Sequence, residues 1–413
     1  MTLPHGFDHG FDPGRLERIG AVIKTRYVET GIIPGALTMV WRRGQVAHLS
    51  LSGLMDVERN TAMREDTIFR IYSMTKPITS LAFLMLMEEG KAALDDPVHR
   101  YIPGFEKLQV YAGGDLAEGF QTVPASRPMK IIDLMRHTSG LTYGFLERTK
   151  LDAAYAKLAV AEPHTEGGLA AMITQLEKLP LQFSPGETWN YSVATDVLGY
   201  LVEKISGENF ADFIRRRILL PLNMRDTDFF VAPEKQPRLA SCYYSKAGKM
   251  LLYDDGRNST YAAPPKLESG GGGLAGTAAD YLRFCRMLLG GGALDGIRLL
   301  SPKTVSLMTM NHLPGGREMT QMMPATQTFS ETGYAGVGFG LGVAVTVNLS
   351  HAMLPGTVGE YSWGGAAATY FFCDPREDMA VIFMTQMLAA PERIRLRRDL
   401  RTLVYGAMSE SFA

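Results

Sequence analysis

Ser73-Met74-Thr75-Lys76 places a hydroxyl and an ammonium three residues apart at the start of a strongly apolar segment. If this segment is a helix, the two side chains share one face. A serine alone is a poor nucleophile at neutral pH, and a nearby lysine helps to remove its proton only when burial and local charges lower the pKa of the lysine. The spacing therefore suggests covalent catalysis, although roughly one such pair is expected by chance in a chain of this length.

The segment that follows the pair is apolar on nearly every side. Residues 78–87 are typical of a helix that is buried all round, and Gly90 provides its stop signal. The run is shorter than the roughly 18 apolar residues that a membrane span needs. Pro77 disfavours α geometry at Lys76 but is tolerated in a first turn. We therefore expect a helix that begins at or just before Ser73.

Composition argues against several classes of protein. The 413 residues carry 42 Lys and Arg against 43 Asp and Glu, a formal net charge of −1, so no electrostatic footprint for nucleic acid or an anionic membrane is visible. Arginines between residues 393 and 401 are interspersed with leucines at helical spacing. That pattern is typical of the solvent-facing side of a terminal helix.

The metal-binding residue types form no convincing site. Cys242, Cys285 and Cys373 lie far apart with no CxxC pair, so neither a disulfide framework nor a zinc site follows. His5 and His9 have helical clamp spacing, but the glycines and proline around them favour a flexible end. No HExxH or EF-hand loop occurs, so we expect no metal and no cofactor. The N-terminus lacks the features of a signal peptide, and a cytoplasmic protein is the default expectation.

Strand-like patterns occur near both ends of the chain, and helical patterns lie between them. Expected strands cover residues 36–41, 46–52, 68–72, 338–347, 367–372 and 379–385, and expected helices cover residues 15–30, 193–205 and 391–408. This order predicts an α+β fold with one antiparallel sheet built from both chain ends and flanked by helices. We expect a sheet domain of residues 1–90 and 240–413, and a mainly helical inserted domain of residues 91–239.

The glycine run 270–273 has two interpretations. Gly271, Gly273 and Gly276 formally match GxGxxG, but residues 266–269 are not an apolar strand and no GK[ST] makes the run a phosphate loop. We therefore expect a tight turn before a helix over residues 278–289.

A Ser–Lys pair needs a further group that accepts a proton during acylation and donates one to the leaving group. Tyr191 is the candidate, because it opens a predicted helix in Trp189-Asn190-Tyr191-Ser192-Val193. At a helix N-terminus the dipole and a neighbouring lysine favour phenolate. Most tyrosines are simply packed with a satisfied hydroxyl, so the position of Tyr191 alone leaves both interpretations open.

Three short stretches together resemble a known superfamily. Ser73-x-x-Lys76, then Tyr191-Ser192-Val193, then Trp363-Gly364-Gly365 match, in order and rough spacing, the three boxes of the serine β-lactamase and penicillin-binding-protein-like superfamily. The chain is more closely similar to the class C β-lactamase-related esterases, often called family VIII esterases. Supporting stretches cover residues 136–141, 186–187, 221–227, 271–281 and 300–305. The resemblance implies a β-lactamase/transpeptidase-like fold.

The resemblance also implies a role for each matching residue. Ser73 would be the acyl-accepting nucleophile, Lys76 the group that activates it, and Tyr191 the acid–base. The third box would lie on a strand that borders the active site. The N–H groups of Ala366 and Ser73 would form the oxyanion hole.

Two departures from the lactamases bear on specificity. Val193 stands where class C lactamases carry the asparagine of Tyr-x-Asn, and Trp363 stands where they carry the lysine that pairs with the drug's carboxylate. A substrate-binding wall of Val193, Trp363, Gly364 and Gly365 suits a neutral acyl ester better than an anionic β-lactam. Similar replacements occur in the esterase relatives.

His137 and Ser139 also allow a catalytic interpretation. They are only two residues apart, however, and the chain has no GxSxG elbow. Their match to a recurrent loop of the superfamily favours a structural turn.

Three functions fit these observations. The first is a carboxylesterase for short-chain acyl esters, and the second is an acyltransferase in which an alcohol takes the acyl group from Ser73, with an acceptor site in loops such as residues 141–151. The third is a non-catalytic or cell-wall-binding penicillin-recognising module, which predicts an export signal and usually a lost Ser73, Lys76 or Tyr191; a weak β-lactamase is a further alternative. We expect an esterase with a small-molecule ester substrate and no nucleic-acid or membrane partner. The number of subunits does not follow from the sequence.

Overall fold

The computed structural model describes residues 9–323 and 335–412, so His5 lies outside the described residues. Its largest sheet has eight strands in the order β12-β13-β14-β15-β16-β1-β2-β3, and all neighbouring pairs are antiparallel. The strands are β1 (Gly35–Arg42), β2 (Gln45–Asp56), β3 (Thr61–Ala62), β12 (Val337–Phe339), β13 (Ala344–Thr346), β14 (Tyr361–Gly364), β15 (Tyr370–Asp374) and β16 (Met379–Met384).

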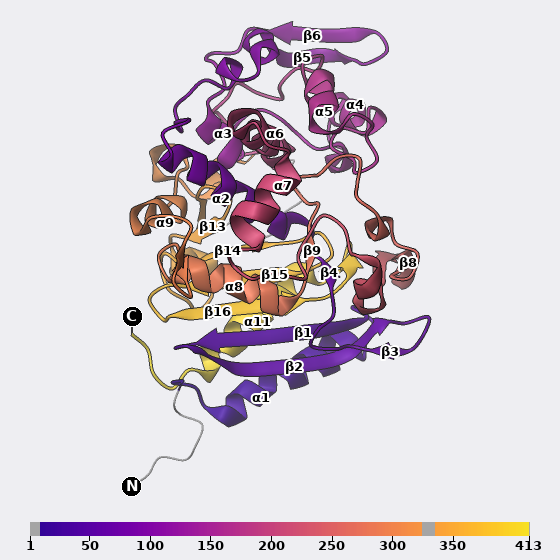
Figure 1. The fold of residues 1–413 in the computed structure, drawn as a ribbon, viewed down its shortest axis with the longest axis vertical. Coiled ribbons are helices and arrows are strands. Elements are labelled where there is room, and N and C mark those ends of the chain that lie inside the picture. The colour runs from indigo at the N-terminus through magenta and orange to yellow at the C-terminus, as the bar shows by residue number, and fades with distance from the viewer. Residues whose placement is uncertain (1–8, 324–334, 413) are drawn as a thin grey trace.

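The two ends of the chain meet inside this sheet. β1 pairs with β16, with Val40 opposite Val381, and Figure 1 shows the indigo strands next to the yellow ones. All of β1 is buried, because it lies between neighbouring strands and between layers of helices. The predicted α+β fold, with an antiparallel sheet built from both chain ends, is confirmed.

Helices cover both faces of the sheet. α1 (Pro13–Val22), continued by a π-helical turn (Ile23–Val28), packs with α11 (Arg393–Ala407) in a core that includes Val40 and Val381. α8 (Ala278–Leu289) packs on β16 and β1 in a larger core that includes Met39 and Ile382. Successive residues of each strand therefore face different cores, as the period of two requires.

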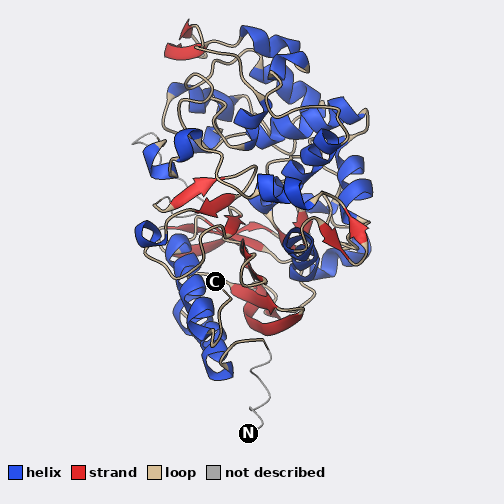
Figure 2. Cartoon of the chain, turned by 90° about the vertical axis from the view of Figure 1, so that its left-hand side faces the viewer, coloured by secondary structure: helices blue, strands red, loops and turns tan. Residues whose placement is uncertain are grey.

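The rest of the chain is mainly helical, as Figure 2 shows above the strands of the sheet. Its helices are α2 (Thr75–Glu88), α3 (Ile131–Met135), α4 (Lys150–Lys157), α5 (Gly168–Leu176), α6 (Ala194–Ser206), α7 (Phe210–Ile214), α9 (Pro302–Met308) and α10 (Leu349–Ala352). Small sheets pair β5 (Val110–Asp115) with β6 (Gly119–Val123), β10 (Ala293–Leu294) with β11 (Ile297–Arg298), and β7 (Cys242–Lys246) with β8 (Lys249–Asp254) and β17 (Met387–Leu388).

The predicted division at residues 90/91 and 239/240 stays a prediction. One hydrophobic cluster includes residues from both predicted parts, among them Met39, Leu134 and Ile382. Within the described ranges, no helix is both long and apolar enough to cross a membrane.

Three predicted elements are wrong in detail. The expected strand 68–72 does not join the main sheet: β4 (Phe69–Arg70) pairs instead with β9 (Ala275–Gly276). The chain leaves strand geometry at Tyr72, whose φ is +45°. The expected strand 338–347 is a hairpin of β12 and β13, because Gly342 between them has a φ of +91°.

The arginines of α11 do not all face solvent, which corrects the third prediction. Arg397 and Arg401 are buried. Arg397 donates hydrogen bonds to the carbonyl oxygens of Gly365 (3.2 Å) and Thr369 (2.9 Å), and Arg401 forms a buried ion pair with Glu360. Helical spacing shows which positions share a face, but not which of the faces meets a buried acceptor.

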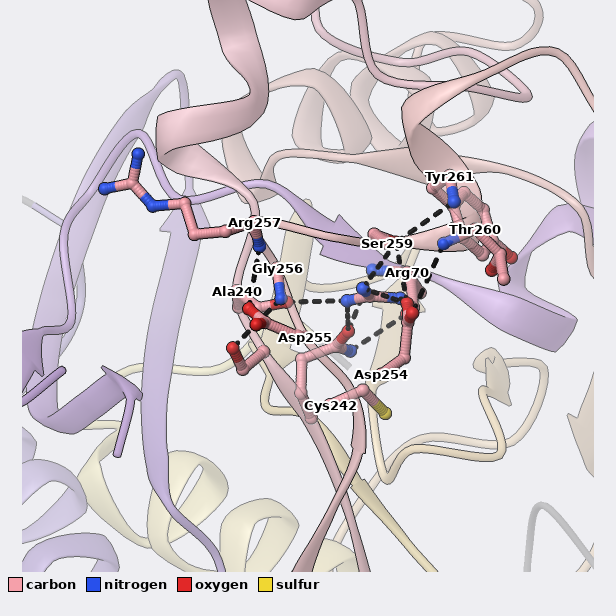
Figure 3. A network of polar contacts seen from close by, with 12 residues as sticks. Arg70, Ala240, Cys242, Asp254, Asp255, Gly256, Arg257, Ser259, Thr260 and Tyr261 are labelled. Carbon is pink, nitrogen blue, oxygen red and sulfur yellow. Dashed lines mark hydrogen bonds and ion pairs between the residues drawn. The ribbon is translucent and has the colours of Figure 1, made fainter. Parts of the chain in front are cut away.

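A buried polar network anchors the segment just before Ser73 (Figure 3). The guanidinium of Arg70 on β4 forms an ion pair with Asp254, and it also donates to the carbonyl oxygen of Ala240 (2.6 Å) and to Ser259 Oγ (2.8 Å). Arg70 is fully buried. The network therefore ties β4 to β8 and to the chain that follows β8.

Removing one partner of this buried pair should destabilise the fold strongly. We expect Arg70→Ala to lower the free energy of unfolding by about 3–5 kcal/mol, because Asp254 then keeps a partly buried charge without its ion-pair partner. Arg64→Ala is the control, since the Arg64–Asp66 pair is exposed and such pairs contribute less than about 1 kcal/mol. Urea denaturation of both variants measures the difference. Equal losses in the two variants would contradict this account.

Candidate active site

Ser73 lies in a short 3-10 turn that leads directly into a helix. The turn covers Tyr72–Met74, and α2 begins at Thr75, so the prediction that a helix begins at or just before Ser73 is confirmed. Pro77 occupies the first turn of α2, where its missing N–H breaks no helical hydrogen bond. The positive φ of Tyr72 is a sparsely populated conformation for a residue with a side chain, and it sets the direction in which Ser73 leaves the preceding strand.

The ammonium of Lys76 is buried against three oxygen atoms. Lys76 Nζ lies 3.3 Å from Ser73 Oγ, 3.0 Å from the hydroxyl oxygen of Tyr143 and 2.7 Å from the carbonyl oxygen of Gly271. The side chain is almost completely shielded from solvent. An ammonium has three N–H donors, and each of these oxygens can accept one of them.

Tyr191 contacts Ser73 directly. Its hydroxyl donates to Ser73 Oγ at 2.6 Å, and Lys76 Nζ lies 4.5 Å from the centre of its ring. The phenol is not at a helix N-terminus as predicted, because α6 begins at Ala194, with Val193 as its N-cap residue. Tyr191 lies in the preceding loop, held by hydrogen bonds from Asn190 N to His137 O (2.8 Å) and from Val193 N to Thr142 O (3.2 Å).

Aromatic side chains form the wall behind Tyr191. The ring of Trp363 lies 5.6 Å from that of Tyr191, and the rings of Trp363 and Phe339 are 5.2 Å apart. Val193 and Trp363 are both fully buried. The structure thus places these two predicted substrate-binding residues beside the catalytic candidates, in apolar surroundings.

The third box ends on a tight turn beside the strand that leads to Ser73. β14 contains Trp363 and Gly364, and Gly365 follows, with its N–H bonded to the carbonyl oxygen of Thr369 at 2.9 Å. A Cβ added at Gly365 would lie 2.2 Å from Thr369 Oγ1 and 2.5 Å from Ile71 O. Glycine is therefore required for this close approach.

Two backbone N–H groups, that of Ser73 before α2 and that of Ala366 after β14, are the predicted oxyanion-hole donors. Ala366 follows the turn and is partly exposed. Within residues 9–323 and 335–412, neither the N–H of Ala366 nor that of Ser73 donates a hydrogen bond. Free N–H groups of this kind suit an oxygen that gains negative charge.

His137 and Ser139 do not form a catalytic pair. His137 Nδ1 lies 3.3 Å from Ser192 Oγ, and Ser139 Oγ accepts a hydrogen bond from Leu141 N at 3.3 Å. Burial, together with the charge of Lys76, holds the pKa of His137 well below its usual value. The imidazole is therefore a neutral packing group, with its ring 4.9 Å from that of Tyr191.

The structure adds two partners of Lys76 that the sequence did not reveal, Tyr143 and Gly271. Tyr143 lies in the loop predicted to hold an acceptor site. Its 67-residue separation from Lys76 matches no helix or strand period, so the sequence pattern could not predict their contact. Gly271 contributes only a backbone carbonyl, which leaves no signature in side-chain chemistry. In the sequence, the glycine run itself was the only sign that the backbone at this place packs closely against another element.

Comparison with known proteins places the chain in a family. The family model described as Beta-lactamase matches residues 23–405. Protein Rv1367c of Mycobacterium tuberculosis is 37% identical over 87% of each chain, and Esterase EstB of Burkholderia gladioli is 31% identical over 92% of this chain and 93% of its own.

Two solved structures resemble the fold closely. EstCE1, a hydrolase with promiscuous acyltransferase activity, has a TM-score of 0.78 at 27% identity and covers 95% of this chain and 99% of its own. A class C beta-lactamase has a TM-score of 0.68 at 15% identity and covers 96% of this chain and 97% of its own; at that identity the likeness shows the fold alone.

Proposed function

Because this chain belongs to the beta-lactamase family, we propose that it is a serine hydrolase that cleaves short-chain carboxylic esters through an acyl-enzyme on Ser73. The observation that carries the proposal is the position of Ser73 Oγ, 2.6 Å from the Tyr191 hydroxyl and 3.3 Å from Lys76 Nζ. The relative named as an esterase supports ester chemistry, and the hydrolase structure with acyltransferase activity supports acyl transfer more generally.

Acylation needs a base at Ser73. In its phenolate form, Tyr191 takes the proton of Ser73 as Oγ bonds to the carbonyl carbon of the ester, and the resulting tetrahedral intermediate collapses when its bond to the alcohol oxygen breaks. Tyr191 then returns the proton to the departing alcohol. In the second half, water gives a proton to Tyr191 and attacks the acyl carbon, and Ser73 leaves with that proton.

Lys76 acts in this scheme as a buried ammonium. Its three oxygen contacts each accept an N–H, and its charge lies against the ring of Tyr191. A nearby positive charge favours the phenolate of Tyr191 over the phenol. Lys76 thereby activates Ser73 through Tyr191 rather than by taking the proton itself.

The free N–H groups of Ser73 and Ala366 form the oxyanion hole in this proposal. They lie on the turn before α2 and on the turn after β14, which Gly365 brings to Ile71. Donors that are already oriented stabilise the charge of the tetrahedral intermediate without reorganisation.

The apolar wall selects the substrate in the same proposal. Val193 and Trp363, with Gly364 and Gly365, offer no cation and no side-chain amide to a ligand carboxylate. A neutral ester loses nothing in such a site, whereas an anionic β-lactam loses its charged partner.

A covalent probe tests the proposal most directly. Treatment with a phosphonate ester should add one group to the protein, and peptide mass analysis should place it on Ser73, because Ser73 Oγ lies within hydrogen-bond distance of both Lys76 Nζ and the Tyr191 hydroxyl. Ser73→Ala should take up no probe and still unfold at the wild-type temperature. An adduct on Ser139, or none on Ser73, would reject the proposal.

The acid–base role of Tyr191 predicts a specific kinetic defect. We expect Tyr191→Phe to lower kcat by roughly 10²–10⁴ with a much smaller change in KM. Tyr361→Phe is the matched control, since the hydroxyl of Tyr361 is buried without a hydrogen-bond partner among the described residues. Steady-state kinetics with a nitrophenyl ester compares the two variants, and nearly full activity in Tyr191→Phe would exclude the role.

Trp363 replaces the lysine of the lactamases, and the loss of this cation predicts a preference for neutral esters over β-lactams. A charge-assisted hydrogen bond is worth about 1.5–3 kcal/mol, and the missing amide removes further orientation. Ester hydrolysis should therefore exceed cephalosporin hydrolysis by about two orders of magnitude or more in kcat/KM. Parallel kinetics on a short-chain nitrophenyl ester and a chromogenic cephalosporin measures this ratio, and comparable values would show that another cation replaces the missing lysine.

Acyl transfer to an alcohol is the second candidate function. Phe145 is exposed and stacks on Tyr143 with ring centres 4.7 Å apart, so an aromatic surface borders the site beside Lys76. An alcohol held there would compete with water for the acyl-enzyme. Adding a second alcohol to the ester assay and quantifying the new ester separates transfer from hydrolysis.

A further inference from the structure

The glycine run 270–273 and the following Leu274 lie along the first turns of α2 and form three hydrogen bonds with it. Leu274 N donates to Thr75 Oγ1 (3.1 Å), Lys76 donates to Gly271 O (2.7 Å), and Thr79 Oγ1 donates to Gly270 O (2.8 Å). The turn predicted from the glycines is therefore present, and its backbone is part of the environment of Lys76.

A buried carboxylate holds this turn from the other side. Asp196 lies in the first turn of α6 and is 1% exposed. Its Oδ1 accepts hydrogen bonds from Ser269 Oγ (2.5 Å) and from Gly271 N (2.9 Å). Its Oδ2 is buried without a hydrogen-bond partner in the described part of the chain. The negative charge on Oδ2 is therefore not offset by a hydrogen bond to that oxygen from the residues that the structure describes.

Gly271 lies between the Asp196 carboxylate and the Lys76 ammonium and is hydrogen-bonded to both. Its N–H is bonded to Asp196 and its carbonyl oxygen to Lys76. A Cβ added at Gly271 would lie 2.4 Å from Asp196 Oδ2, so the carboxylate rests directly on the glycine. The position of Asp196 therefore decides where the Gly271 carbonyl points.

The two charges also act on each other. Burial raises the pKa of Asp196 above its usual value, and the positive charge of Lys76 opposes that rise. After burial, the charge of Lys76 is the largest influence on that pKa. Lys76 in turn faces Tyr143, Tyr191 and the neutral His137. The carboxylate of Asp196 and the ammonium of Lys76 therefore favour each other's charged form.

We propose that Asp196 is a positioning residue for Lys76: its carboxylate orients the Gly271 carbonyl toward the ammonium, and its charge keeps Lys76 protonated. This inference rests on the proposed function, since it assigns Asp196 to the Ser73 acylation step. The hydrogen-bond partners that the described part of the chain gives Asp196 are Ser269 and Gly271, so its effect on Ser73 passes through Gly271 and Lys76.

Replacing the charge tests the inference. We expect Asp196→Asn to slow Ser73 acylation by roughly 10–100-fold, the effect of a small misplacement of a catalytic group, with little change in KM. A carboxylate stabilises a nearby ammonium, so its removal should move the alkaline limb of the pH–rate profile to lower pH. Asp280→Asn is the matched control, because Asp280 is another buried carboxylate but bonds to Asp226 and Thr227.

A pair of glycine variants tests the geometry without touching Asp196. Gly271→Ala forces the turn away from the carboxylate and should slow acylation in the same way. A Cβ at Gly272 would meet nothing closer than 3.7 Å, so Gly272→Ala should keep the wild-type rate. If Asp196→Asn fails to fold, the two glycine variants still test whether the contact between Asp196 and Gly271 positions Lys76.

Burst kinetics and phosphonate labelling, measured across pH on all five proteins, give distinguishable outcomes. The inference is supported if Asp196→Asn acylates slowly and its alkaline limb is shifted. It also requires that Gly271→Ala acylates slowly while Gly272→Ala does not. Wild-type rates and pH profiles in Asp196→Asn and Gly271→Ala overturn it while leaving the proposed function intact. Failure of the wild-type protein to label at Ser73 overturns both.

Discussion

Burial of the Lys76 ammonium is the constraint on which the rest of this site depends. An unpaired ammonium out of water costs several kcal/mol, so it is tolerated only where oxygen atoms surround it. Ser73, Tyr143 and Gly271 supply those atoms within 3.3 Å, from three separate segments of the chain. Satisfying one charge therefore fixes the relative positions of α2, the loop after Leu141 and the glycine run.

The large sheet supports this arrangement from below. β14, which bears the third box, belongs to this sheet, and the turn that contains Ser73 packs against β14. Arg70 secures the approach to Ser73, and Arg397 secures the turn after β14 by donating to Gly365 and Thr369. Arg397 thus holds the turn after β14 through its backbone carbonyls, and Arg70 anchors the strand that leads into the turn of Ser73.

Much of this was predictable from sequence, and the failures have physical causes. The buried apolar helix after Ser73, the central pairing of the chain ends and the place of Tyr191 near Lys76 follow from patterning and from the three boxes. The partnership of Gly271 and Asp196 with Lys76 does not, because backbone carbonyls and contacts across more than seventy residues leave no periodic signal. Burial of Arg397 and Arg401 depends on acceptors in distant strands, and helical spacing cannot locate them.

The protonation state of Lys76 is the central claim, and neutron diffraction of the deuterium-exchanged protein at neutral pD observes it directly. We expect three deuterons on Lys76 Nζ, directed at Ser73 Oγ, the Tyr143 hydroxyl and the Gly271 carbonyl. Two deuterons on Nζ would show a neutral amine that takes the serine proton itself. That result would contradict both the activation of Ser73 through Tyr191 and the role of Asp196 as the charge that keeps Lys76 protonated.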